Sequence, residues 1–225
     1  MSDATLEIRG LQLKRGERVI VDHVEIQARC GELIVLRGAS GSGKTTLLRA
    51  IAGLDPFAAG TIQVGDARLA GGVPQDRAML QRLRRNVAFV FQFHCLFEHM
   101  SALKNVCLAP VHVRGLPARE AERRARDLLA QLGVEPRAEN LPRELSGGEA
   151  QRVAIARALA VDPPVLLMDE PMASLDPSRR ADLGALLQRL SAAGRTLLVT
   201  SHDEGFARQH ATRVLAIEEG TVRDA

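Results

Sequence analysis

The clearest chemical signal in the sequence is a glycine-rich stretch that ends in a lysine and a hydroxyl residue. It consists of Gly38, Ala39, Ser40, Gly41, Ser42, Gly43, Lys44 and Thr45, and Thr46 follows it. This stretch fits the P-loop pattern GxxxxGK[ST], in which backbone N–H groups converge on phosphate oxygens. We expect Lys44 to reach the β- and γ-phosphates and the Thr45 hydroxyl to ligate Mg²⁺. The alternative is a tight turn with an idle lysine, and the strand and helix expected on either side disfavour it.

A second signal is a short apolar strand that ends in two carboxylates. The predicted strand is Val165–Met168, and Asp169 and Glu170 follow it directly. The carboxyl ends of parallel strands form the edge of a sheet at which ligands bind. We therefore expect Asp169 to hold Mg²⁺ and its waters, and Glu170 to polarise the attacking water as a general base. Any strand can end in acids before a loop, so this prediction depends on the P-loop.

A third signal is a serine followed by two glycines at the start of a helix predicted to run to about Ala160. These residues are Ser146, Gly147 and Gly148, within the stretch 145–151. A helix N-terminus of this kind can bind an anion. Two γ-phosphate-sized sites in one chain indicate a sandwich, in which each nucleotide contacts the P-loop of one copy and this turn of another. The alternative is an ordinary glycine-rich helix cap.

Three further polar residues complete the set found from the residues alone. His202 follows the predicted strand Thr196–Thr200, so we expect it at the same sheet edge as the two carboxylates, in contact with the γ-phosphate. Gln92 follows the predicted strand Val87–Phe91, and we expect it to bind Mg²⁺ or the attacking water. Asp176 is placed to cap the helix after it, and it can also cross a dimer interface.

The hydrophobic pattern predicts the α/β core that these motifs need. Apolar runs and alternations predict strands over residues 5–13, 19–26, 33–36, 87–91, 165–168, 196–200 and 214–217. Helices are predicted from Lys44 to about Ala52 and from Asp176 to Gly194. Strand patterns are absent between 92 and 145, where Ser101 and Pro117 mark helix starts. We predict a helical insertion there, over roughly 93–150.

Composition limits the class of protein. The chain has 225 residues, 46% of them hydrophobic and 25% charged, which suits a soluble domain with a sizeable core. We find no apolar run near the roughly eighteen residues of a membrane span and no secretion signal at the N-terminus, so a cytosolic chain is expected. The mild net charge of +3 and the absence of Trp and Tyr give no reason to expect nucleic acid.

Together and in this order, the motifs resemble those of the nucleotide-binding subunits of ABC transporters over nearly the whole chain. The matching stretches are Gly38–Thr45 for Walker A, Leu145–Gln151 for the signature motif, Val165–Asp169 for Walker B and Ser174–Asp176 for the D-loop. The matching single residues are Gln92 for the Q-loop, Glu170 for the catalytic base and His202 for the switch histidine.

Other stretches resemble the branch of the family that takes up polar amino acids, namely residues 91–100, 109–115 and 205–208. The chain departs from the family at two positions. Arg15 stands where the family usually has an aromatic residue that stacks on adenine. We expect the planar guanidinium to lie on the base instead, and the alternative is a solvated loop residue. Met172 stands where a small polar residue is usual.

The resemblance implies a fold and a division of the chain. The fold is α/β, a P-loop NTPase core with an N-terminal antiparallel β subdomain and an inserted helical subdomain. Residues 1–225 would form one ABC ATPase domain, with 1–92 and 151–225 as the catalytic core. Residues 93–150 would form the helical subdomain, which carries the signature motif at its end.

The resemblance also implies an ATPase that uses ATP and Mg²⁺ and works as a head-to-tail homodimer. Its partners would be integral-membrane permease subunits and, indirectly, a substrate-binding protein. These partners would place it on the inner face of the cell membrane, in the import of an amino acid. One alternative is an ATPase for lipoprotein release or efflux. Another is a soluble ABC ATPase acting on DNA or ribosomes, disfavoured because tandem cassettes and long coiled coils are absent. A non-hydrolysing regulatory subunit is disfavoured by Glu170 and His202.

Overall fold

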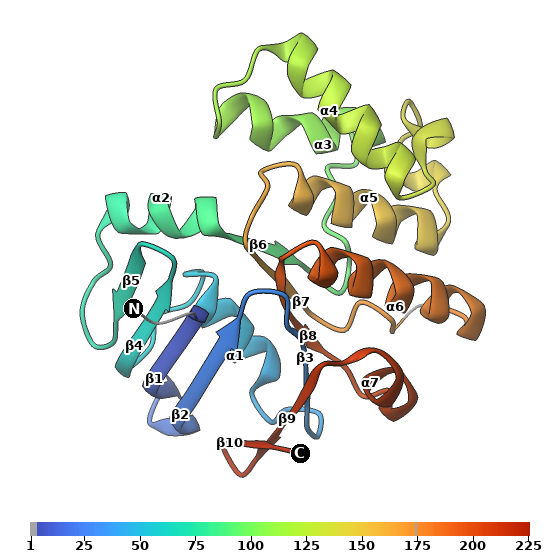
Figure 1. The fold of residues 1–225 in the computed structure, drawn as a ribbon. Coiled ribbons are helices and arrows are strands. Elements are labelled where there is room, and N and C mark those ends of the chain that lie inside the picture. The colour runs from blue at the N-terminus through green and yellow to red at the C-terminus, as the bar shows by residue number, and fades with distance from the viewer. Residues whose placement is uncertain (1–3, 174) are drawn as a thin grey trace.

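The computed structural model describes residues 4–173 and 175–225 and contains two β-sheets (Figure 1). The larger sheet has the strand order β10-β9-β3-β8-β7-β6. Its strands are β3 (Leu33–Arg37), β6 (Val87–Val90), β7 (Val165–Met168), β8 (Thr196–Thr200), β9 (Arg213–Glu218) and β10 (Thr221–Asp224). All neighbouring pairs are parallel except β9 and β10. The carboxyl ends of β3, β6, β7 and β8 therefore meet at one edge.

The smaller sheet is antiparallel and has the order β2-β1-β4-β5. Its strands are β1 (Ala4–Arg15), β2 (Arg18–Arg29), β4 (Ala59–Val64) and β5 (Ala67–Ala70). The predicted N-terminal β subdomain is thus confirmed, but β4 and β5 were not predicted. They are short, and Gly60 in β4 lies against the β1 backbone, where a Cβ would come 2.4 Å from the Gly10 oxygen. Burial alternates over Ile62–Val64 and along β5, but such short alternations are weak evidence for a strand.

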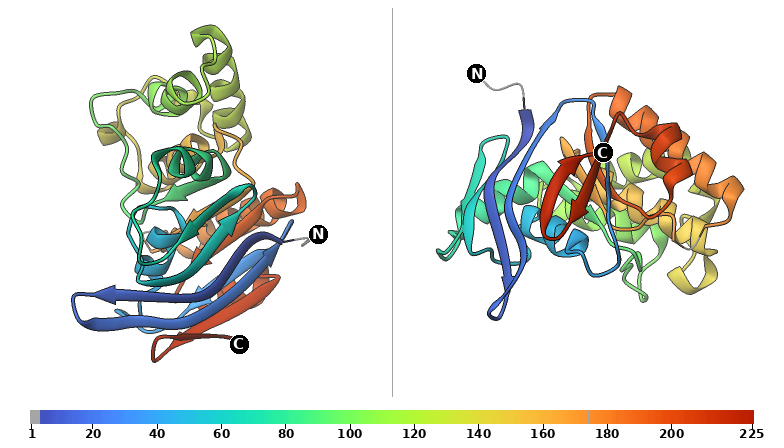
Figure 2. Two further views of the ribbon diagram at one scale, coloured as in Figure 1. Left: turned by 90° about the vertical axis from the view of Figure 1, so that its left-hand side faces the viewer. Right: turned by 90° about the horizontal axis from the view of Figure 1, so that it is seen from below.

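Seven α-helices lie around the sheets in the described parts of the chain. They are α1 (Lys44–Ile51), α2 (Arg77–Asn86), α3 (Ala102–His112), α4 (Ala118–Gln131), α5 (Gly147–Leu159), α6 (Pro177–Ala192) and α7 (Glu204–His210). Figure 2 shows the antiparallel sheet at one end of the molecule and α3 and α4 at the other. No strand lies between β6 and β7, as predicted. None of the described helices is long and apolar enough to cross a membrane.

The larger sheet is buried on both faces, which explains its continuous apolar strands. In β3, Leu33 and Val35 pack into the core beside α3–α6, whereas Ile34 and Leu36 pack into the core beside α1 and the antiparallel sheet. All four are 0% exposed. Burying such a side chain stabilises the fold by about 1.5–3 kcal/mol. This packing fixes the sheet edge that carries the polar residues.

Candidate functional site

A cavity of about 790 Å³ opens at the edge where the parallel strands end. Most of the residues singled out from the sequence line it, namely Arg15, Ser40, Gly41, Gly43, Lys44, Thr45, Thr46, Gln92, Glu170 and His202. Gly38 and Ala39 line an adjoining cavity that shares His202. The fold therefore brings together side chains from β1, the P-loop and the loops after β6, β7 and β8.

The P-loop lies so close to its neighbours that two of its glycines cannot be replaced without movement. A Cβ on Gly38 would come 2.5 Å from the Ile217 Cγ2 atom. Gly43, with φ 103°, precedes α1, and a Cβ there would come 2.8 Å from the Val21 Cγ2 atom. The backbone N–H groups at the start of α1 have no intrahelical acceptors, and the helix dipole makes them attractive to phosphate.

Lys44 is held inside the loop by the loop's own carbonyl groups. Its ammonium donates to the Gly38 oxygen at 2.8 Å and to the Ala39 oxygen at 3.0 Å. Burial lowers the pKa of Lys44, while Glu170 and Asp169 act in the opposite direction. The lysine is thus a buried cation positioned at the phosphate-binding turn.

Thr200, which the sequence analysis did not single out, organises the two carboxylates after β7. Its buried hydroxyl donates to Asp169 Oδ1 at 2.8 Å and accepts from the Glu170 N–H at 2.8 Å. Glu170 has φ 45°, a left-handed conformation that costs a non-glycine residue about 1–3 kcal/mol. The sequence does contain a signal for Thr200, because it is a polar residue at the end of the buried strand β8, close to His202.

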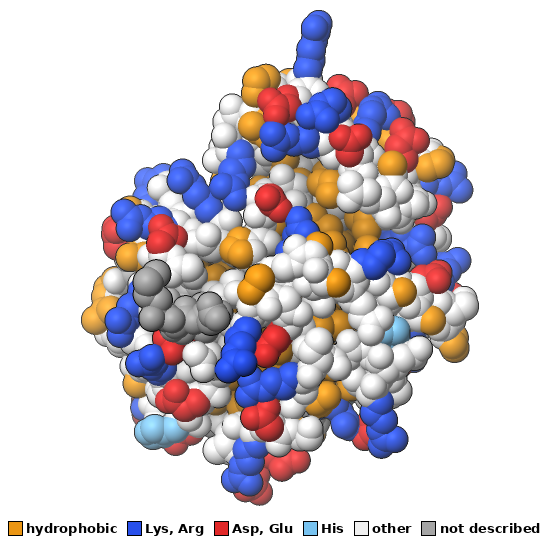
Figure 3. Space-filling view, viewed as in Figure 1, with side chains coloured by type: hydrophobic (Ala, Val, Ile, Leu, Met, Phe, Trp, Pro, Cys, Tyr) orange, Lys and Arg blue, Asp and Glu red, His pale blue; other side chains and the backbone are white. Residues whose placement is uncertain are grey.

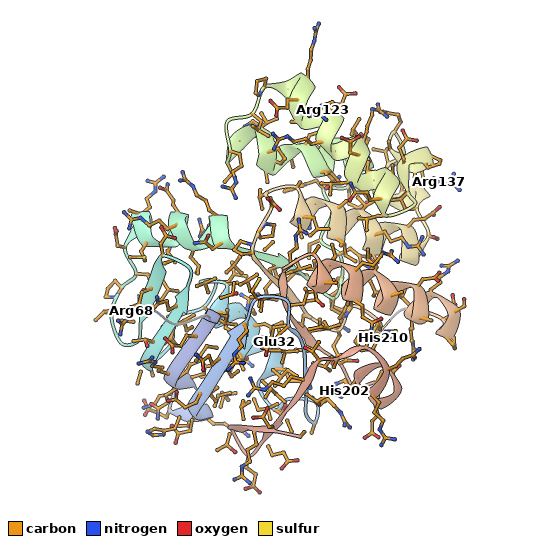
Figure 4. The ribbon with its side chains drawn as sticks, viewed as in Figure 1. Glu32, Arg68, Arg123, Arg137, His202 and His210 are labelled. Carbon is orange, nitrogen blue, oxygen red and sulfur yellow. The ribbon has the colours of Figure 1, made fainter. Side chains whose placement is uncertain are left out.

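The side chains of Glu170 and His202 lie next to each other in the cavity. The His202 Nε2 atom lies 3.1 Å from Glu170 Oε1, which is ion-pair distance. The contact lacks hydrogen-bond geometry, and Oε1 is buried without a hydrogen-bond partner in the described structure. The His202 side chain is 54% exposed (labelled in Figure 4). A carboxylate with a free lone pair suits a general base, and the adjacent imidazole is placed to contact a phosphate beside it.

The positive charge of the cavity suits the negative charge of a nucleoside triphosphate. Lys14, Arg15 and Lys44 supply cations, while Arg49 is paired with Asp55 at 2.7 and 2.8 Å. Ser42 in the P-loop has a buried hydroxyl with no hydrogen-bond partner among the described residues, which a phosphate oxygen would satisfy.

The same site offers oxygen ligands of the kind that Mg²⁺ binds, because the Thr45 hydroxyl and the Gln92 amide line the cavity and Asp169 directly precedes Glu170. No group of three or more His, Cys, Asp or Glu side chains is placed to hold a metal within the described chain. Mg²⁺ usually binds through one or two carboxylates together with phosphate oxygens and water. Asp169, Thr45 and Gln92 are the residues that would hold it.

The predicted second anion site is a well-formed helix cap. Ser146 accepts from the Glu149 N–H at 3.3 Å, and its own N–H donates to Glu149 Oε2 at 2.7 Å. This bond, with that from Arg137, lowers the pKa of Glu149 to about 2. The stretch can be both a helix cap and an anion site, because a capped N-terminus still presents backbone N–H groups.

One chain does not bring the two anion sites together. Gly148 lines a separate cleft of about 280 Å³ between α4, α5 and α6, which shares no lining residue with the P-loop cavity. Asp176 caps α6, as predicted, accepting from the Arg179 N–H at 3.1 Å. Ser174 of the expected D-loop lies outside the described residues. A second copy is therefore needed to complete a site that uses both turns.

Two internal residues have structural rather than catalytic surroundings. Met172 is 3% exposed and packs in the core beside the helices, which accounts for an apolar residue at that position. Asn105 is 0% exposed, accepts from the Phe97 N–H at 2.8 Å and donates to three backbone oxygens of residues 97–101. It fixes the loop that follows Gln92, and no recognisable sequence motif marks it.

The comparisons with known proteins decide the family. The model of the ABC transporter family matches residues 21–173. The chain belongs to the ABC transporter family. This membership confirms the expected family, the P-loop fold class and the ATPase class.

Individual relatives span nearly the whole of this ABC cassette. The L-cystine transport system ATP-binding protein TcyN of Escherichia coli is 40% identical, covering 97% of this chain and 88% of the relative. The lipoprotein-releasing system ATP-binding protein LolD of Chromohalobacter salexigens is 42% identical, covering 91% and 85%. The cassette MJ0796, solved as a dimer bound to ADP and Pi, is 32% identical, with a TM-score of 0.87 and coverage of 98% and 97%.

Proposed function

We propose that this ABC ATPase drives amino acid import by hydrolysing ATP in a head-to-tail dimer attached to permease subunits. The observation that carries the proposal is that Lys44, Glu170 and His202 share one cavity, whereas Gly148 lines another. Similarity to TcyN supports amino acid import, as do the stretches shared with the polar amino acid branch. Similarity to LolD favours lipoprotein release as the second candidate.

In the proposed reaction the protein acts mainly by positioning and by charge. The P-loop N–H groups and Lys44 hold the phosphates, Glu170 takes a proton from the attacking water, and His202 orients the γ-phosphate. Asp169, Thr45 and Gln92 would hold Mg²⁺, which supplies charge neutralisation on the phosphate oxygens when bound. Thr200 keeps both carboxylates in place through its two hydrogen bonds.

The dimer completes the site from the other side. Ser146, Gly147 and Gly148 of the partner subunit would contact the γ-phosphate held by Lys44. Asp176 would lie close to the interface while capping α6. Because binding ATP joins the copies and hydrolysis separates them, the helical segment 93–150 would pass the motion to the permease.

The proposed location is the cytoplasmic face of the membrane, through the permease, with a substrate-binding protein on the other side. A deletion in the source organism tests the transported class. The deletion strain should lose uptake of labelled amino acids, and the intact gene should restore that uptake. Normal uptake with lipoproteins retained in the inner membrane would favour the second candidate instead.

An apolar surface after Gln92 provides the proposed contact with the permease. The Phe93 side chain is 81% exposed and Phe97 is 48% exposed, whereas Met100 is half-buried. Phe97→Glu should weaken copurification with the permease while basal ATP hydrolysis stays unchanged, because Phe97 lies outside the cavity. Val73→Glu, at a residue that is 56% exposed elsewhere, is the matched control. Equal copurification of both variants would contradict the assignment.

Arg15 gives a prediction about the nucleotide base. It ends β1 and lines the P-loop cavity with Lys14 and Ile20. A guanidinium lying on a base contributes about 0.5–1 kcal/mol, so Arg15→Ala should weaken ATP binding roughly two- to fivefold. Arg15→Tyr should restore affinity. Selectivity among ATP, GTP and CTP should be loose, because the phosphates carry most of the affinity. Calorimetric titration decides, and identical affinities in all three proteins would show that Arg15 does not touch the base.

A further inference from the structure

One face of α2 is covered by arginines. Leu83 is buried, and Met79 and Leu80 pack against the core under the antiparallel sheet. At about 100° per residue, the opposite face of the helix carries the remaining long side chains. We call this the arginine face of α2; its residues are all exposed, and they are Arg77, Arg82, Arg84 and Arg85.

These arginines have no acidic partners. None of the four side chains makes an ion pair or a hydrogen bond within the described structure. Helix α4 is different, because Arg123 pairs with Asp127 and Arg124 with Glu120 one turn away. Over residues 67–97 the chain carries five arginines and a single acid, Asp76. The positive charge on this face is therefore not neutralised by the protein.

Helix stability does not explain the arrangement. Cations in the last turn, here Arg84 and Arg85, interact favourably with the helix dipole. Arg77 lies in the first turn, where a cation is unfavourable, and Arg82 and Arg85 are like charges three residues apart. Arg77 and the Arg82–Arg85 repulsion therefore do not stabilise the helix, and an external anion would offset both.

The arginine face continues to the helical segment of the molecule. The Arg114 guanidinium donates to the Arg85 oxygen at 3.1 Å and also to the Val161 oxygen, which joins the end of α3 to the end of α2. The preceding Val113 is 50% exposed. Figure 3 shows the basic side chains gathered over α2, at the upper left. In the proposed function, the adjoining helical segment acts on a membrane permease, so this edge lies on the side of the chain that faces the permease.

We propose that the arginine face of α2 binds anionic phospholipid headgroups of the membrane that holds the permease. This inference rests on the proposed function for its location. Guanidinium groups bind phosphate in a fixed, often bidentate geometry, and the cytoplasmic leaflet has a negative surface potential. Nucleic acid fits less well, because residues 67–88 contain no aromatic side chain on which a base could stack.

Cosedimentation of the purified chain with vesicles tests the proposal. The chain should bind phosphatidylcholine vesicles that contain phosphatidylglycerol and leave pure phosphatidylcholine vesicles unbound. Each basic residue near the surface contributes about fivefold, so the triple variant R77Q/R82Q/R84Q should bind about a hundredfold more weakly. The control R143Q/R208Q/R223Q removes the same charge from three other exposed arginines and should bind like the unmodified chain.

Folding is checked by thermal unfolding and by basal ATP hydrolysis, which neither triple variant should change. Arg77→Gln alone removes an unfavourable first-turn charge, so it should fold normally and still bind about fivefold more weakly. Equal binding of the two triple variants, or equal binding to both kinds of vesicle, would overturn the proposal. So would binding of an RNA oligonucleotide through α2 with no vesicle binding. The vesicles contain no permease, so their binding tests the lipid proposal alone. A chain that binds them but hydrolyses no ATP would contradict the proposed function and leave the lipid proposal standing.

Discussion

Glu170→Gln should reduce ATP hydrolysis by about a hundredfold to ten-thousandfold while leaving ATP binding intact, because the amide cannot accept the proton of the attacking water. The P-loop and Lys44 are unchanged by this substitution, so nucleotide should still join two copies. Without hydrolysis the joined state should persist. Gel filtration with ATP and Mg²⁺ should therefore show a dimer, and phosphate release should be close to background.

The control for this experiment is Glu219→Gln. Glu219, like Glu170, is a loop glutamate in the left-handed conformation, with φ 47°, but it is exposed and lies outside the P-loop cavity. It should hydrolyse ATP at the normal rate. A Glu170→Gln protein that stays monomeric with ATP and hydrolyses it almost normally would remove Glu170 from the role of base.

Gly148→Asp should reduce hydrolysis by on the order of a hundredfold or more, as expected when stabilisation of a phosphate charge is lost. The nearest atom to a Cβ at this position is Arg179 Nη1 at 3.2 Å, the far end of a flexible side chain. The variant should therefore fold, and it should place bulk and negative charge at the second anion site. Gly148→Ala separates the two effects and should lose less activity.

Mixing variants tests whether the site is shared between copies. In the Glu170→Gln background, adding either Gly148→Asp or Lys44→Ala should prevent dimerisation with ATP. A homodimer of either variant has the same defect in both of its sites, in the turn for Gly148→Asp and in the P-loop for Lys44→Ala. A mixture leaves one complete site in each heterodimer, so ATP-dependent dimers should reappear. Normal hydrolysis by Gly148→Asp alone would contradict the shared site.

Local sequence was sufficient for the chemistry and for most of the elements. The P-loop, the carboxylates after β7 and the cap at Ser146 are each written in consecutive residues, and continuous apolar runs marked the parallel strands because both of their faces are buried. The missed elements α2 and β5 do carry helical and alternating patterns, but they are short, with ten residues in α2 and four in β5, and no motif marks them.

Tertiary structure decided what depends on residues far apart in the chain. Thr200 and Asp169 are 31 residues apart, and their hydrogen bond exists because β7 and β8 are neighbours in the sheet. The burial of Met172 likewise depends on helices from elsewhere. The arginine residues of α2 are visible in the sequence, but their lack of partners is a property of the folded surface. The sequence by itself was enough to propose which groups bind and hydrolyse a nucleotide, because most of those groups lie in local motifs. Only the fold determined which of them share a cavity, because the pairing of strands and the packing of helices set the distances between them.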